Sequence, residues 1–154
     1  MKKLLTLFFA LCLCLGIQAQ NMHPLMGIWQ QQSQDRDGRV INLPVWKLIQ
    51  GDGTFCTMLI INRDAKTIKS MEGTYAITSD STYIESVSKG IFNPELNSKA
   101  STLRYKFLTP DQVVITYQMP NQLTATSEIW GRVKLEAPTP RPQGKGPDAA
   151  DFDD

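Results

Sequence analysis

The sequence has little cysteine, a single histidine and no excess of charge of either sign. Its 154 residues include three cysteines, of which Cys12 and Cys14 lie in an apolar stretch near the N-terminus, and the one histidine is His23. A His/Cys/Asp metal site or a Ser-His-Asp arrangement needs partners at recognisable spacing, and the sequence offers none. It also has no phosphate-binding glycine loop and no dinucleotide fingerprint. We therefore expect no metal, no cofactor and no catalytic residue.

Charge and hydropathy narrow the range of partners. The chain has 16 Lys and Arg against 15 Asp and Glu, so a strong basic patch is not expected and neither is a nucleic-acid partner. The long apolar run at residues 4–16 is shorter than the roughly 20 residues that a membrane-spanning helix needs. We expect no membrane span, and the length suits one domain.

The N-terminus has the pattern of a secretory signal peptide. Lys2 and Lys3 precede the apolar run, which ends in small residues at Ala19. The pattern predicts a signal peptide over residues 1–19 and export to the periplasm or the extracellular space. A lipid anchor at Cys12 or Cys14 is the competing interpretation, although a leucine precedes each of them where the lipoprotein peptidase requires a small residue.

The composition changes again after Leu135. Four prolines and a terminal run of aspartates follow, and nothing in this segment could bury an apolar core. We predict that residues 20–135 form the folded domain and that residues 136–154 are a disordered Pro-rich acidic tail.

Between these ends, segments rich in Val, Ile, Thr, Tyr, Phe and Trp alternate with Gly, Pro, Asn and Asp clusters, which is typical of consecutive antiparallel strands. The predicted strands lie near 25–34, 39–50, 54–62, 66–78, 81–88, 101–108, 112–119 and 123–134. Asp52-Gly53 is the strongest hairpin signal, because both residues tolerate positive φ. Pro44 predicts a bulge or bend, because proline removes a donor from the strand ladder.

Side-chain alternation predicts which residues face inward. Leu103, Tyr105 and Phe107 alternate with polar residues, and the next strand repeats the pattern, so the two sets should meet on one buried face. Tyr75 and Ile77 would extend the same wall. The predicted pocket lining is Tyr75, Ile77, Leu103, Tyr105, Phe107, Val113, Ile115 and Tyr117. Tyr75, Tyr105 and Tyr117 would contact a ligand with their rings and hydroxyls.

The strand at 54–61 differs, because it is apolar on both faces. Either its outer face is covered, by the tail or by a partner in a homodimer, or it forms an exposed apolar patch. It contains Cys56, the one cysteine left after signal cleavage, so no intramolecular disulfide is expected. We expect Cys56 to be a small buried residue and not a reactive thiol.

Eight strands joined by short turns must protect two sheet edges, and closing the sheet into a barrel removes both. The predicted fold is all-β, an eight-stranded antiparallel up-and-down barrel whose interior is filled or holds one small ligand. A two-sheet sandwich is the alternative that strand count leaves open.

The two ends of this region support the barrel. Gly27-Ile28-Trp29 opens the first strand and Trp130-Gly131-Arg132 lies in the last, which resembles the lipocalin-like (calycin) pattern. The resemblance implies that Trp29 plugs the closed end and that Arg132 packs over its indole. Trp46-Lys47 followed by Asp52-Gly53-Thr54-Phe55 is similar to small secreted lipocalin-like proteins of unknown function from Bacteroidetes. The likeness covers about residues 25–135 and implies a small-molecule pocket, not a reaction.

The remaining polar features have ordinary explanations. Glu72, Glu85 and Glu128 lie within strands, where two inward carboxylates could form an acid/base pair, but a strand glutamate usually points to water. The connection from 89 to 100 contains a short helix signal at 93–96, and we expect a surface loop there in preference to a lid. Ser81 lies in an Asp80-Ser81-Thr82 sequence similar to an O-glycosylation motif, which is also a plain turn.

Together these features predict an exported, non-enzymatic binding protein that holds a small apolar or amphipathic molecule in the barrel. The alternative is a protein-interaction module with a filled core, which an apolar patch around Met58 and Ile60 would favour. An enzyme ranks third, because it would need an inward-facing carboxylate or a base beside Cys56.

Overall fold

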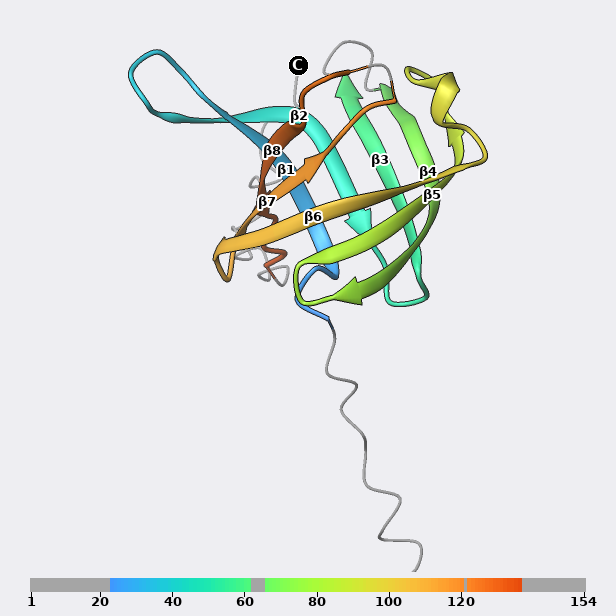
Figure 1. Ribbon diagram of the computed structural model, residues 1–154. Coiled ribbons are helices and arrows are strands. Elements are labelled where there is room, and N and C mark those ends of the chain that lie inside the picture. The colour runs from blue at the N-terminus through green and yellow to red at the C-terminus, as the bar shows by residue number, and fades with distance from the viewer. Residues whose placement is uncertain (1–22, 62–65, 121, 137–154) are drawn as a thin grey trace, which may run out of the picture.

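The computed structural model describes residues 23–61, 66–120 and 122–136. The predicted signal peptide and nearly all of the predicted tail lie outside these residues. Within them the chain forms one closed barrel of eight antiparallel strands, in which each strand pairs with the next and the first pairs with the last (Figure 1). The predicted all-β up-and-down barrel is thus confirmed, and the sandwich alternative is excluded.

The strands lie close to the predicted segments. Their bounds are β1 Gly27–Gln34, β2 Val40–Ile49, β3 Thr54–Ile61, β4 Lys66–Ser79, β5 Thr82–Gly90, β6 Lys99–Thr109, β7 Gln112–Tyr117 and β8 Thr126–Arg132. A 3-10 helix, η1 (Pro94–Leu96), lies between β5 and β6. No helix in the described part of the chain has the length and apolar character needed to cross a membrane.

Turn and bulge chemistry sets the register of β2. Gly53 has φ +82°, and Asp52 accepts hydrogen bonds from the Thr54 backbone and hydroxyl, so the β2–β3 hairpin forms where predicted. The pairing of β1 with β2 shifts between Gln30 and Gln32, opposite the segment that contains Pro44. The proline therefore occupies a bulge, as expected of a residue without a backbone donor.

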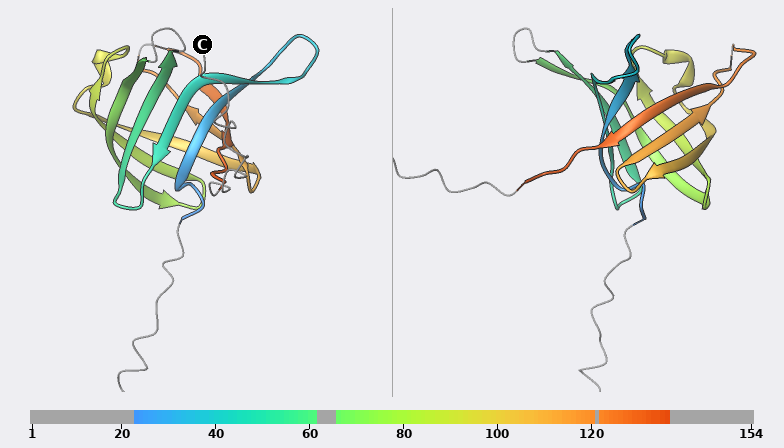
Figure 2. Two further views of the ribbon diagram at one scale, coloured as in Figure 1. Left: turned by 180° about the vertical axis from the view of Figure 1, so that it is seen from behind. Right: turned by 90° about the vertical axis from the view of Figure 1, so that its left-hand side faces the viewer.

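The barrel has two different ends. β1 and β5 both begin at the lower end in Figure 1, and Trp29 and Tyr83 lie near their starts. These two residues belong to a core cluster with Leu25 and Val113, and all four are essentially inaccessible to solvent. At the other end the β1–β2 hairpin extends well beyond the barrel wall, and Val40 and Ile41 near its tip are exposed (Figure 2). Side chains thus fill the first end, and the second end is bordered by connections.

Arg132 closes the filled end against Trp29. Its guanidinium carbon lies 4.2 Å from the centre of the Trp29 ring, and Nη1 and Nη2 donate to the carbonyls of Met26 and Pro24 at 2.8 and 2.5 Å. Gly27 has φ +138°, and a Cβ there would lie 2.7 Å from Arg132 Nη1. The Gly-x-Trp pattern and the distant arginine are therefore one structural unit, and the expected Trp29–Arg132 contact is present.

The strand expected to be apolar on both faces is β3, and it does carry apolar side chains on both. Phe55 of β3 is buried in the barrel, whereas Cys56, Met58 and Ile60 belong to the outer face and are partly exposed. Cys56 was expected to be buried and is only partly so, because alternation places it outside, opposite Leu48 and Glu72. A homodimer through this strand stays a prediction.

Candidate functional site: a polar cavity in the barrel

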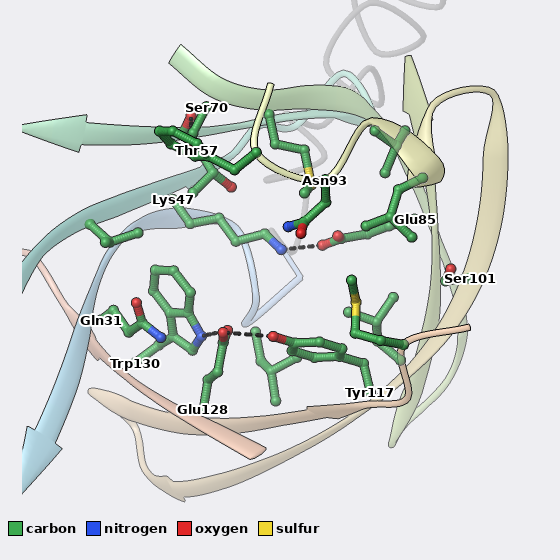
Figure 3. Close-up of a pocket in the computed structure, with 18 of the residues that line it drawn as sticks. Gln31, Lys47, Thr57, Ser70, Glu85, Asn93, Ser101, Tyr117, Glu128 and Trp130 are labelled. Carbon is green, nitrogen blue, oxygen red and sulfur yellow. Dashed lines mark hydrogen bonds and ion pairs between the residues drawn. The ribbon is translucent and has the colours of Figure 1, made fainter. Parts of the chain in front are cut away.

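A cavity of about 200 Å³ lies inside the barrel, toward the end opposite Trp29. It is bordered by strand residues and by the connections that follow β5 and β7. The lining comprises Gln31, Val45, Lys47, Thr57, Ser70, Met71, Glu85, Val87, Phe92, Asn93, Leu96, Ser101, Leu103, Ile115, Tyr117, Gln118, Met119, Glu128 and Trp130 (Figure 3). This lining is mixed, with an apolar wall and two polar networks.

The first network is a buried ion pair. Lys47 of β2 and Glu85 of β5 are 6% and 5% exposed, and Lys47 Nζ donates to Glu85 Oε1. The Tyr83 hydroxyl donates to the same oxygen at 3.0 Å, and the ammonium lies 5.0 Å from the centre of the Phe55 ring. The two charges are therefore fixed by each other and by aromatic neighbours, which offsets part of their desolvation.

The second network is centred on Glu128 of β8. Oε1 accepts a hydrogen bond from the Tyr117 hydroxyl at 2.8 Å, and Oε2 accepts one from Trp130 Nε1 at 3.1 Å. Figure 3 shows these three side chains on the opposite side of the cavity from Lys47 and Glu85. Both donors are uncharged, so the carboxylate is oriented without being neutralised.

The two carboxylates affect the tyrosines beside them. Burial raises the pKa of Tyr83 well above its usual value, and the charge of Glu85 and its hydrogen bond raise it further. Burial likewise raises the pKa of Tyr117, with added contributions from the charge of Glu128 and from its hydrogen bond. Both phenols therefore stay protonated and act as hydrogen-bond donors at neutral pH.

The apolar wall includes the segment between β5 and β6. Leu96 of η1 is buried, and Phe92 and Asn93 also border the cavity. The segment is anchored by hydrogen bonds from Ile91 N to the Ser70 carbonyl at 3.0 Å and from Ser98 N to the Val87 carbonyl at 2.8 Å. Between β5 and β6 the chain is exposed apart from half-buried Asn93 and buried Leu96, which agrees with the expected surface loop. The inward side chain of Leu96 also makes this loop part of the cavity wall.

Three of the eight predicted pocket residues line this cavity, namely Leu103, Ile115 and Tyr117. The other five do not line it and pack toward the closed end. They are Tyr75, Ile77, Tyr105, Phe107 and Val113. The Tyr75 hydroxyl donates to the Gln50 carbonyl at 2.7 Å, and the Tyr105 hydroxyl donates to the Ser79 carbonyl at 3.0 Å. Alternation identified the inner face but not how far along it the cavity extends.

The charged residues of the cavity were missed or placed outside. Glu85 and Glu128 were expected to point to water, and both face inward, whereas Glu72 lies on the outer face and pairs with Lys69 at 2.7 Å. Lys47 was not considered as a pocket residue. Alternation held the signal, because Lys47 lies between inward Val45 and Ile49, and Glu85 lies between Tyr83 and Val87.

Comparison with known proteins identifies a family but no function. The model of a family described as a domain of unknown function, DUF4488, matches residues 24–142, and the chain belongs to this family. No curated protein matches the chain. Among the described residues no group of three or more His, Cys, Asp and Glu side chains could hold a metal ion.

Proposed function

We propose that this protein is an exported, lipocalin-like carrier that binds one small amphipathic molecule in the barrel cavity. The observation that supports this proposal is the cavity itself, in which an apolar wall meets two oriented polar networks. Such a combination is typical of small-molecule sites, where apolar surface gives affinity and a few placed polar groups fix orientation. Export rests on the charged and apolar pattern of the first 19 residues.

The size of the cavity limits the ligand. Sites for drug-sized molecules usually occupy about 300–1,000 Å³, and the volume here is about 200 Å³. A ligand with a short hydrocarbon part and one polar end suits this space. Its hydrocarbon part would contact Leu96, Leu103 and Ile115, and its polar end would meet the charged side chains.

The test uses isothermal titration calorimetry with 1-hexanol and a variant that fills the cavity. Ser101 lines the cavity, and the next residue, Thr102, is exposed on the outer face of β6. We expect wild type to bind with Kd on the order of 0.1–1 mM, the range for a ligand of so few atoms. Ser101→Phe should abolish binding, and Thr102→Phe should not. Absent binding to wild type, or equal binding to both variants, would contradict the proposal.

A second candidate is the interaction module, favoured by the outer apolar face at Trp46, Met58 and Ile60, which are partly exposed. Sedimentation of the protein at increasing concentration measures whether it forms a dimer, which distinguishes the interaction module from the carrier. A dimer that Met58→Lys dissociates, with no hexanol binding, would favour this candidate over the carrier.

A further inference from the structure

We infer that the cavity selects a cationic ligand, a small alkylamine-like molecule whose ammonium group pairs with Glu128; this inference rests on the proposed function. The charges that line the cavity are one ammonium, Lys47, and two carboxylates, Glu85 and Glu128. Because Lys47 is matched by Glu85, the unmatched charge in the cavity is negative and belongs to Glu128.

Glu128 has no cationic partner in the described part of the chain. The ion pairs found there join Lys47 to Glu85, Lys69 to Glu72, and Arg132 and Lys134 to Asp111. The guanidinium of Arg132 is held at the closed end by backbone carbonyls, so it cannot serve the cavity without breaking the closure. A cation for Glu128 would therefore come from a ligand.

The carboxylate is preorganised to receive that cation. Each oxygen of Glu128 accepts one hydrogen bond, from Tyr117 on one side and from Trp130 on the other. A carboxylate has about four acceptor positions, so roughly two remain for a ligand. An ammonium group has three N–H donors and no acceptor, so it suits a carboxylate whose oxygens keep free acceptor positions.

The rings around Glu128 suit a cation as well. Tyr117 and Trp130 both line the cavity beside the carboxylate, and ammonium groups are attracted to the faces of such rings. Lys47 illustrates the same preference within this barrel, since its ammonium lies against Phe55 and Tyr83. An anionic ligand would instead meet Glu128 directly, and the one ammonium that could attract it is already paired.

The hydrocarbon part of the ligand has its own place. Met71, Val87, Leu96 and Met119 line the cavity, together with Leu103 and Ile115. A compact alkyl chain on this wall would carry its head group toward Tyr117, Glu128 and Trp130. The expected class is therefore a primary amine with a short apolar chain.

The experiment compares three probes of equal chain length by calorimetry at pH 7: hexylamine, 1-hexanol and hexanoate. Alkylammonium groups resemble lysine, with a pKa of about 10.4, so hexylamine is charged under these conditions. We expect wild type to bind hexylamine at least about tenfold more tightly than hexanol, because hydrogen bonds to a charged group are the stronger kind. Hexanoate should bind most weakly.

Glu128→Gln removes the charge and keeps an oxygen that can accept a hydrogen bond from Tyr117 or Trp130. This variant should bind hexylamine and hexanol with equal affinity. The control is Glu72→Gln on the outer face, which should keep the tenfold preference. If Glu128→Gln does not fold, the order of the affinities of wild type for the three probes still decides whether the cavity selects a cation.

The outcomes separate the two proposals. Equal binding of hexylamine and hexanol by wild type, or tighter binding of hexanoate, would overturn the cationic ligand and leave the carrier intact. The loss of preference in Glu72→Gln would also overturn it, because surface charge would then be the cause. No binding of any probe would overturn the carrier together with the inference.

Discussion

The pair of Lys47 and Glu85 carries two charges in positions that alternation reserves for the barrel interior. A buried pair contributes little net stability, but removing one partner leaves the other charge desolvated and unmatched. Lys47→Met should therefore lower the free energy of unfolding by about 3–5 kcal/mol. The measurement is urea denaturation followed by circular dichroism.

The double variant distinguishes this cause from lost packing. Lys47→Met with Glu85→Leu replaces both charges by apolar groups of similar volume, so it should recover most of the stability lost in Lys47→Met alone. If the stability lost in the double variant equals the sum of the losses in Lys47→Met alone and Glu85→Leu alone, the ion pair is not the reason for the effect. In that case other contacts of the two side chains, such as that of the Lys47 ammonium with the Phe55 ring, would account for the lost stability.

Gly27 is a second residue whose replacement should destabilise the barrel. Its φ of +138° disfavours any other residue, and a Cβ would collide with the Arg132 guanidinium that stacks on Trp29. Gly27→Ala should cost about 1–3 kcal/mol for the backbone alone, and more if Arg132 is displaced. Thermal melting checks the size of the loss. Gly38→Ala is the control for backbone strain without a clash, because Gly38 also has positive φ and nothing lies near its Cβ.

At the scale of elements, the segment from 91 to 98 is expected to open independently of the barrel. Leu96 is its one buried side chain, and short hydrogen-bonded anchors fix both of its ends. Truncating a buried leucine to alanine costs about 2–5 kcal/mol, enough to raise local opening more than tenfold. Leu96→Ala should therefore speed amide hydrogen exchange at 92–97 and leave the exchange of β6 and β7 unchanged.

Phe92 provides the matched control for that measurement, because it lies in the same segment and is 60% exposed. Phe92→Ala should leave exchange at 92–97 nearly unchanged. If Leu96→Ala instead accelerated exchange in every strand, the segment would be part of the global core. The connection would then open only together with the barrel.

The strands show what could be read from the sequence and what could not. Turn residues such as Asp52-Gly53 and the alternation of Leu103 and Tyr105 act locally, so the order of elements and the inner face of β6 were predictable. The cavity depends on how residues from distant strands meet, which no local pattern contains. The inward positions of Lys47 and Glu85 were not predicted. The rule that charged side chains face water fails where two strands supply opposite charges that pair with each other.

One property is shared by tyrosines throughout the barrel: all four have a raised pKa. Burial is the main cause that raises the pKa of Tyr75, Tyr83, Tyr105 and Tyr117, and carboxylates add to it in each case. The fold therefore favours the neutral phenol, and the unfolded chain ionises near pH 10. The stability from this preference is fully present below about pH 10 and is lost as the pH rises through the folded values.

Alkaline titration monitored by absorbance at 295 nm measures this property directly. We expect the native protein to show less phenolate at pH 10 than the protein in denaturant, whose tyrosines are about half ionised there. The free energy of unfolding should fall above that pH, with buried Tyr83 contributing up to about 1.4 kcal/mol per pH unit. Tyr83→Phe should reduce this slope, because phenylalanine has no proton to lose. Four tyrosines that ionise near pH 10 in the folded protein would contradict the buried hydroxyl networks, and with them the interior position of Glu85 and Glu128.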